Sequence, residues 1–284
     1  MKIKKRINQL NILKKELDRV FPKQYGDDKF KEDLKINFTF YSNRIEGNKL
    51  SYGETIRYLK EGLVSKSASI RDIADLKNHK EILDKIFEVY DTFNISVDTI
   101  KEIHKELMRD PEQWGGGIID AIQGPGKYRQ EEVGTETEEG YIEYISLFEV
   151  PEAMRTLVED VNKQLMELDI NTIDRHPLTI ATRFHNGFMH IHPFRDGNGR
   201  TGRIFTNTIL MKNGFSPMII KDKKAYIRSI IKSENKNDIQ PTLDYFCDVL
   251  SENIKKNIQY AINKNKMLNR EIKKENNGDK GMMM

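Results

Sequence analysis

The sequence has little cysteine, because Cys247 is the single cysteine among its 284 residues. One cysteine cannot form an internal disulfide, which excludes a small disulfide-held scaffold and fits a reducing compartment. The chain also lacks any apolar run of the roughly 18 residues that a membrane span needs, and its lysine-rich start lacks the apolar segment of a signal peptide. We therefore expect a cytoplasmic protein that does not cross a membrane.

A strong charge of one sign is absent as well. The 47 lysine and arginine side chains exceed the 44 aspartate and glutamate side chains by only three, and both signs are spread along the chain. This balance disfavours a dedicated nucleic-acid-binding surface. At 284 residues the chain is long enough for one large domain or for a core with an appendage.

Apolar residues at helical spacing are abundant, and they predict a mainly α-helical fold. The helices are expected at residues 2–21, 34–47, 69–90, 98–109, 152–168, 177–189 and 226–231, and from Pro241 onwards. The stripe of helix 2–21 favours packing on the chain's own core, and pairing with a second subunit is the alternative. Residues 115–150 predict a hairpin or flap, because glycines interrupt the spacing and β-forming residues flank an acidic middle.

The densest group of chemically useful residues is the stretch 192–203, His-Pro-Phe-Arg-Asp-Gly-Asn-Gly-Arg-Thr-Gly-Arg. Gly197 and Gly199 let the backbone turn and present successive N–H groups to one point. The apolar spacing that follows predicts a helix ending at Lys212. A helix N-terminus stabilises a phosphate, so the stretch predicts a phosphate site.

Four side chains around this turn suit phosphate chemistry. Arg200 and Arg203 are three residues apart, so we expect both guanidiniums on one helix face, where they can bind phosphate oxygens. Asp196 is a hard oxygen ligand of the kind that Mg²⁺ takes when phosphates complete its shell. His192 titrates near neutral pH and can accept a proton. Together they predict a nucleotide phosphate site with a general base beside it.

Two other interpretations of this region are weaker. The glycines of residues 197–202 match the dinucleotide-binding fingerprint, but no short apolar strand precedes them and no strand-helix-strand pattern surrounds them. His185, His190 and His192 suggest zinc, but their spacings do not place them on one helix face.

Residues 192–203 resemble the signature loop of the Fic family, His-x-Phe-x-Asp/Glu-Gly-Asn-Gly-Arg-x-x-Arg, and match every specified position. The resemblance implies a mainly helical fold and transfer of AMP from ATP to a hydroxyl of a target protein. Carried over by position, His192 would deprotonate that hydroxyl, Asp196 would hold Mg²⁺, and Phe194 would anchor the loop in the core. The anion hole and the β- and γ-phosphate contacts would come from Gly197, Asn198, Gly199, Arg200 and Arg203.

A second short pattern lies earlier in the chain. Residues 42–47, Ser-Asn-Arg-Ile-Glu-Gly, match the Ser/Thr-x-x-x-Glu-Gly/Asn pattern of the inhibitory helix found in many Fic proteins. The resemblance implies that Glu46 pairs with Arg203, so that ATP binds in a non-productive pose. Ser42 would help to orient Glu46, and Gly47 ends the helix. Without the resemblance, Ser42 and Glu46 would be a solvated polar face.

The resemblance also gives a role to the flap, which we place at about residues 118–148. In the Fic family a β-hairpin here aligns the target's main chain by strand addition. A preference for basic targets is one interpretation of its acidic middle, and a solvated loop is the other. The acidic residues are Glu136, Glu138, Glu139 and Glu143.

We therefore expect an N-terminal helical region at 1–62, a Fic core at 63–270 and a disordered tail at 271–284. The expected function is a protein adenylyltransferase that uses ATP and Mg²⁺, modifies a Ser, Thr or Tyr hydroxyl, and is restrained by Glu46. Two alternatives stay open: a hydrolase that removes AMP with the same site, and a non-catalytic nucleotide sensor. Self-modification, the target protein and assembly into homo-oligomers are not decided by the sequence.

Overall fold

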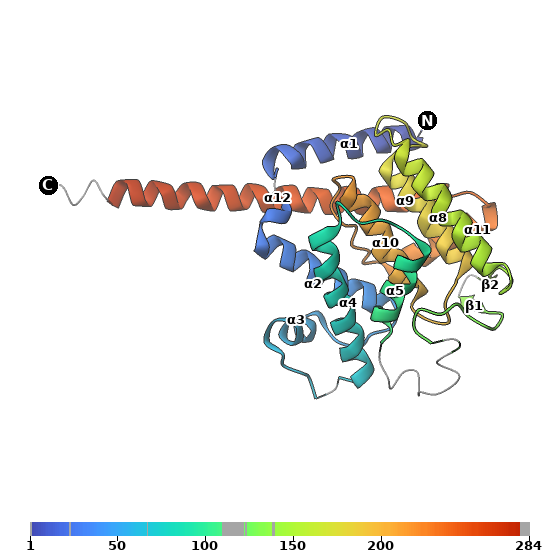
Figure 1. Ribbon diagram of the computed structural model, residues 1–284. Coiled ribbons are helices and arrows are strands. Elements are labelled where there is room, and N and C mark those ends of the chain that lie inside the picture. The colour runs from blue at the N-terminus through green and yellow to red at the C-terminus, as the bar shows by residue number, and fades with distance from the viewer. Residues whose placement is uncertain are drawn as a thin grey trace.

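The computed structural model describes residues 2–22, 24–66, 68–109, 122, 124–137 and 140–278, and it is mainly helical, as the sequence predicts. Its centre is a pair of helices, α9 (Pro177–Ile191) and α10 (Asn198–Lys212), which pack against each other (Figure 1). Both are buried along most of their length. The short segment that joins them, residues 192–197, is therefore held next to the core.

The other helices surround this pair. Helix α8 packs on α9, α11 packs on α9 and α12, and α5 contacts both α8 and α10. Helix α2 packs on α4 and also contacts α10. The bounds are η1 Gln24–Gly26, α2 Asp28–Ile45, α3 Tyr52–Glu61, α4 Ile70–Val89, α5 Val97–Leu107, α8 Val150–Met166, α11 Lys223–Lys236 and α12 Gln240–Gly278.

Helix α2 carries the end of the N-terminal region into the site. It begins at the N-cap Asp27, whose side chain accepts a hydrogen bond from the Phe30 amide, and Glu46 forms its C-cap. Gly47 follows with φ +101°, a left-handed conformation that glycine adopts without strain. Glu46 is thereby fixed at the point where the chain turns away from α10.

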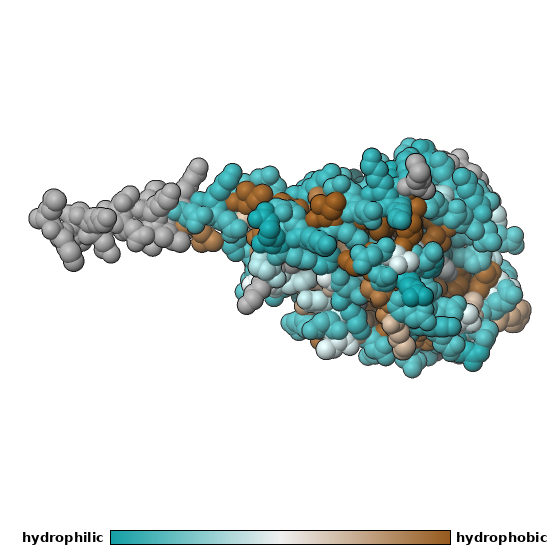
Figure 2. All heavy atoms as spheres, turned by 90° about the horizontal axis from the view of Figure 1, so that it is seen from above, coloured by the Kyte–Doolittle hydropathy of each residue, from teal (hydrophilic) through white to brown (hydrophobic). Residues whose placement is uncertain are grey.

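Helix α1 (Lys2–Val20) lies along α12 (Figure 1) and buries Ile7, Leu10 and Leu17. The chain's own core therefore covers the apolar stripe of α1. Helix α12 extends beyond the rest of the molecule, and Figure 2 shows apolar side chains on its projecting part, where Met267 and Leu268 are exposed.

The tail predicted from residue 271 was wrong as far as Gly278, because α12 continues to that residue. Lysine and glutamate are favourable helix formers, so a polar segment continues a long helix without needing a core. Residues 279–284 lie outside the described chain. None of the helices in the described ranges has the length and apolar character that would let it cross a membrane.

The predicted flap contains one small antiparallel hairpin. Strand β1 (Gly134–Thr137) pairs with β2 (Gly140–Glu143), and Thr135 lies opposite Ile142. The strands occupy only part of the predicted range, and most of residues 110–123, including the glycine run at 115–117, lies outside the described chain. The division predicted at residue 62 stays a prediction.

Replacing Leu10 by Ala should lower the free energy of unfolding by about 2–5 kcal/mol, because Leu10 is fully buried and its loss leaves a cavity. Ile12, on the same helix, is 59% exposed, so Ile12→Ala should change that free energy by no more than about 0.5 kcal/mol. Urea denaturation followed by circular dichroism measures both. Equal effects at the two positions would contradict the packing of α1.

Candidate functional site

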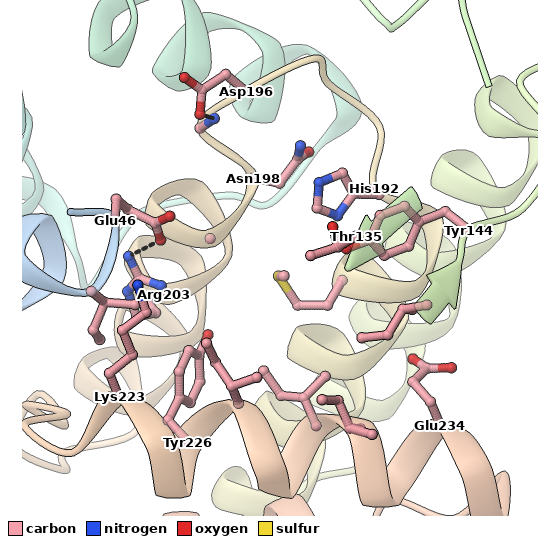
Figure 3. A pocket seen from close by; sticks show the side chains of 18 of the residues that line it. Glu46, Thr135, Tyr144, His192, Asp196, Asn198, Arg203, Lys223, Tyr226 and Glu234 are labelled. Carbon is pink, nitrogen blue, oxygen red and sulfur yellow. Dashed lines mark hydrogen bonds and ion pairs between the residues drawn. The ribbon is translucent and has the colours of Figure 1, made fainter. Parts of the chain in front are cut away.

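A cavity of about 320 Å³ opens at the start of α10 (Figure 3). It is lined by the end of α2, the loop between α9 and α10, the flap and one face of α11. One half is polar and contains Glu46, Asp196 and Arg203. The other half is mostly apolar and includes Ile142, Ile227 and other isoleucines of α11, so the cavity suits a ligand with one charged and one apolar end.

His192 stands at the C-cap of α9 with φ +47°, so the chain turns there and the imidazole reaches the cavity. Its carbonyl accepts a hydrogen bond from Arg129 Nε at 3.0 Å. Burial lowers the pKa of His192 to about 4, against opposing contributions that include Met189 and Glu46. The pKa of His192 therefore lies below the near-neutral value expected from the sequence. At neutral pH the ring is uncharged, which is the state that can accept a proton.

Asn198 stabilises the loop that joins α9 to α10. Its amide donates to the Phe194 carbonyl at 2.7 Å, and its side-chain oxygen accepts from the Phe194 amide at 3.0 Å. Gly197 adopts φ +79° and caps α10. Phe194 is fully buried, as the sequence predicts for a core anchor. The amides at the start of α10 are thus presented from a rigid turn.

His104 supports this turn from α5, and no pattern in the sequence indicated its partners. Its ring stacks on Phe194 with centroids 3.7 Å apart, Nδ1 accepts from the Gly126 amide at 2.9 Å, and Nε2 lies 2.8 Å from the Asp196 carbonyl. Because Nδ1 accepts, Nε2 carries the proton and donates to Asp196. His104 therefore connects the segment that leads to the flap with the loop at residues 192–197.

Asp196 lies on the loop and lines the cavity. Oδ1 accepts from the Gly197 amide at 2.6 Å, and Oδ2 lies 3.0 Å from Arg71 Nη2. No group of three or more His, Cys, Asp or Glu side chains suited to a metal occurs within the described ranges. A single carboxylate fits Mg²⁺ that is bound together with phosphates, and it does not fit an all-protein metal site.

Arg203 is the buried cation of the site, with 3% of the residue exposed. Nη2 donates to Glu46 Oε1 at 2.7 Å and to the Ser42 carbonyl at 2.9 Å, and Nε donates to Ser42 Oγ at 3.0 Å. Burial opposes its charge, but Glu46 and Tyr226 outweigh that effect and raise the pKa of Arg203. The structure thus places Glu46 on Arg203. Ser42 also binds Arg203 directly, and its expected part in orienting Glu46 stays a prediction.

The Glu46 carboxylate also lies against Gly199, in the first turn of α10. A Cβ atom at position 199 would approach Glu46 Oε1 to 2.3 Å, so a side chain there would push the carboxylate from this place. This is the end of a helix dipole that favours an anion. Glu46 therefore occupies the place predicted for a phosphate.

Arg200 differs from the prediction that placed it beside Arg203 on the phosphates. It is almost completely buried, forms an ion pair with Asp75 of α4 and does not line the cavity. Helical spacing gave both arginines one face, but Asp75, a partner 125 residues away, holds Arg200 outside the cavity. The sequence offered no signal for Asp75.

Three further residues at the site were missed by sequence reasoning. Tyr226 of α11 is buried beside Arg203, with its ring centroid 5.7 Å from the guanidinium carbon, and its hydroxyl lies 2.8 Å from His185 Nε2. Tyr144 stacks on His192. Glu234, at the other end of α11, lies 3.1 Å from His190 Nδ1. His185 therefore contacts Tyr226, and His190 contacts Glu234.

Comparison with known proteins identifies the central part of the chain. Residues 94–210 match the Fic/DOC family model. The chain contains a Fic/DOC domain. The protein adenylyltransferase Fic of Drosophila erecta is 26% identical over 254 residues, which are 86% of this chain and 46% of that protein. The Drosophila melanogaster protein of the same name is 27% identical over 77% of this chain and 41% of its own length. The chain thus spans less than half of these relatives.

Solved structures share the fold. A Fic-domain-containing signalling protein from Bacteroides thetaiotaomicron is 26% identical, covers 91% of this chain and 97% of its own, and has a TM-score of 0.77. Fic-1 from C. elegans (residues 134–508) is 24% identical, covers 90% of this chain and 71% of its own, and has a TM-score of 0.70. The second likeness concerns the fold alone.

The Fic domain should lose stability as pH falls from 6.5 towards 4. Burial lowers the pKa of His104, His176 and His192 to about 4 and that of His185 to about 3. The unfolded chain therefore binds protons in this range while the folded chain resists them. Urea denaturation across this range measures the loss, and a flat profile would contradict these buried neutral histidines.

His104→Phe should keep the stack on Phe194 but leave the Gly126 amide and the Asp196 carbonyl without this partner. At neutral pH it should lower the free energy of unfolding by about 1–3 kcal/mol. It should also make the loss of stability between pH 6.5 and pH 4 smaller. His190→Gln is the control, because Glu234 raises the pKa of His190. That variant should still lose stability as the pH falls from 6.5 towards 4.

Proposed function

We propose that this Fic domain is a protein adenylyltransferase that moves AMP from ATP to a Ser, Thr or Tyr hydroxyl of a target protein. The observation that carries the proposal is the placement of three groups around one cavity: the neutral imidazole of His192, the N-terminus of α10 and the guanidinium of Arg203 (Figure 3). The name of the Drosophila relatives supports the same activity.

We assign the nucleotide to the cavity because the residues that line it suit both the phosphates and the base. The phosphates would lie at the amides of residues 197–199 and at Arg203, where the helix dipole and a buried cation favour anions. The base and ribose would lie in the apolar half, between Ile142 of the flap and Ile230 of α11. We assign the phosphate contact to Arg203 alone, and Arg200 supports the loop through Asp75.

In the proposed reaction, His192 takes the proton of the target hydroxyl as its oxygen attacks the α-phosphorus in line. The new oxygen–phosphorus bond forms while the bond to the bridging oxygen of the β-phosphate breaks, and pyrophosphate leaves with that electron pair. The amides at the start of α10 and Arg203 stabilise the developing negative charge. Mg²⁺, held by Asp196 and the phosphates, would neutralise part of it.

Glu46 restrains this reaction by occupying the anion position. While its carboxylate lies on Arg203 and against Gly199, a γ-phosphate cannot reach the guanidinium. ATP would then bind displaced, with the α-phosphate out of line with the hydroxyl. The restraint comes from one side chain at the end of α2, so removing that side chain should release it.

The target would approach along the flap. Tyr141 and Glu136 face each other across the hairpin, and both are exposed. The acidic side chains there favour a basic target segment that pairs with the hairpin by strand addition.

AMP removal is the alternative that one observation favours. Glu46 lines the same cavity as His192, and 34% of its side chain is exposed. A carboxylate in that position can direct a water molecule at an AMP-modified residue. This hydrolase would need Glu46, whereas the transferase is inhibited by it.

Transfer of label from α-labelled ATP to protein, with Mg²⁺ present, tests the proposal. Glu46→Gly should label protein at least about ten-fold faster than the wild type, because Arg203 becomes free for the γ-phosphate. Glu46→Gln keeps the size but removes the charge, and should be activated to a smaller extent. Glu46→Gly combined with His192→Ala should be inactive.

The outcomes separate the candidate functions. Labelling that is fastest in Glu46→Gly, slower in Glu46→Gln and absent once His192→Ala is added supports a restrained transferase. Release of AMP from a modified protein by the wild type, lost in Glu46→Gly, would establish the hydrolase instead. ATP binding without turnover in every variant would leave a nucleotide sensor.

Mg²⁺ should raise the ATP affinity of the Glu46→Gly variant by at least about ten-fold, and adding Asp196→Asn should abolish most of that gain. ATP binding without the metal should persist. Calorimetry with and without Mg²⁺ measures this gain. Glu234→Gln is the matched control, since that carboxylate lies at the opposite end of the cavity (Figure 3). An equal loss in both variants would remove Asp196 as the metal ligand.

A further inference from the structure

The flap reaches the catalytic loop through one aromatic ring. Tyr144, the residue after β2, stacks on the His192 imidazole with centroids 3.9 Å apart and planes inclined by 13° (Figure 3). Its hydroxyl lies 2.7 Å from Thr135 Oγ1 in β1. The ring is therefore held by the partner strand at one end and covers the imidazole with its face.

Arg129 joins the same two segments at the level of the backbone. Its guanidinium is fully buried and donates to the carbonyls of His192 and Glu131, at 3.0 and 2.9 Å, and to that of Ile145. Its own amide donates to the Pro193 carbonyl at 2.9 Å. Both ends of the flap are thus attached to the turn that carries His192.

The stack has two physical consequences for the base. A parallel ring at contact distance limits rotation of the imidazole out of the plane in which it meets a hydroxyl. It also removes water from one face of His192. Among the described residues, Tyr144 is the one whose ring stacks on this imidazole. Because Tyr144 belongs to the flap, the flap supplies a restraint that α9 does not.

We propose that Tyr144 is a positioning residue for His192: its stacked ring holds the imidazole in its reactive orientation and makes the base depend on the placement of the flap. The proposal deepens the proposed transferase and rests on it for its catalytic meaning. The contact itself can be tested without turnover.

The groups around His192 give the expected direction of a titration test. Burial, together with Arg129, lowers the pKa of His192, whereas Met189, Glu46 and Asp196 raise it, and the result is about 4. Removing the Tyr144 ring would let water solvate the imidazolium from one face. The pKa of His192 should then move upwards, towards the ordinary value of 6.5.

The experiment compares Tyr144→Phe, Tyr144→Leu and Tyr144→Ala with Tyr141→Ala as the control, because Tyr141 lies on the same hairpin and is 68% exposed. Nuclear magnetic resonance follows the His192 ring in the chain with Glu46 intact, with His192→Ala used for assignment. Tyr144→Phe and Tyr141→Ala should leave the pKa of His192 unchanged. Tyr144→Ala and Tyr144→Leu should raise it by at least about one unit.

Transfer in the Glu46→Gly background is the second readout. Tyr144→Ala should lower kcat about ten-fold or more while KM for ATP stays within about two-fold, and Tyr144→Phe should retain activity. The proposal is overturned if Tyr144→Ala and Tyr144→Leu change neither the pKa of His192 nor kcat, or if Tyr144→Phe loses as much as Tyr144→Ala. A shifted pKa without transfer in any Glu46→Gly variant supports the positioning role and rejects the proposed transferase.

Discussion

The buried guanidinium of Arg203 is the constraint on which the rest of the site depends. A charge that has left water needs a counter-charge and hydrogen bonds, because an unpaired buried charge is strongly destabilising. Arg203 belongs to a helix that is itself buried, and Ser42 and Glu46 supply its partners from α2. The contact that places α2 against α10 is therefore made to the same group that the proposed γ-phosphate would use.

In the proposed function, this shared group would make inhibition and activation two occupancies of one anion position. Glu46 is partly exposed, so its carboxylate can return to water at little cost when a phosphate replaces it. The proposed phosphate would then neutralise Arg203, and the buried cation would keep a counter-charge in both states. Gly199 permits the exchange because it leaves the space above the first turn of α10 free of a side chain.

Features of this molecule that depend on local patterns could be predicted from the sequence. The helices follow from apolar spacing, and the turn at 197–199 follows from its glycines. The link between Glu46 and Arg203 was implied only by the resemblance of two short motifs to the Fic family, because the two residues are 157 positions apart. The contacts of Arg200, His104 and Tyr144 could not be predicted. Their partners lie 125, 92 and 48 residues away, and no periodicity encodes which side chains the packing of helices brings together.

The ion pairs of Arg200 show how the charges of the loop are balanced. Asp75 and Asp196 alternate with Arg71 and Arg200 in a closed ring of ion pairs: Arg71 lies 3.0 Å from Asp196 and 4.0 Å from Asp75, and Arg200 lies 3.7 Å from Asp196 and also contacts Asp75. A network of this kind holds its members better than an isolated surface pair does.

A cation that binds Asp196 must compete with Arg71, whose side chain is exposed and can move into water. Arg200 cannot move in this way, because it is buried against Asp75. In the proposed reaction, Mg²⁺ would therefore displace Arg71 while the phosphates displace Glu46, and the buried arginines would stay in place. The site then needs no rearrangement of its core to pass from the restrained to the active state, since both displaced side chains lie at its solvent-facing edge.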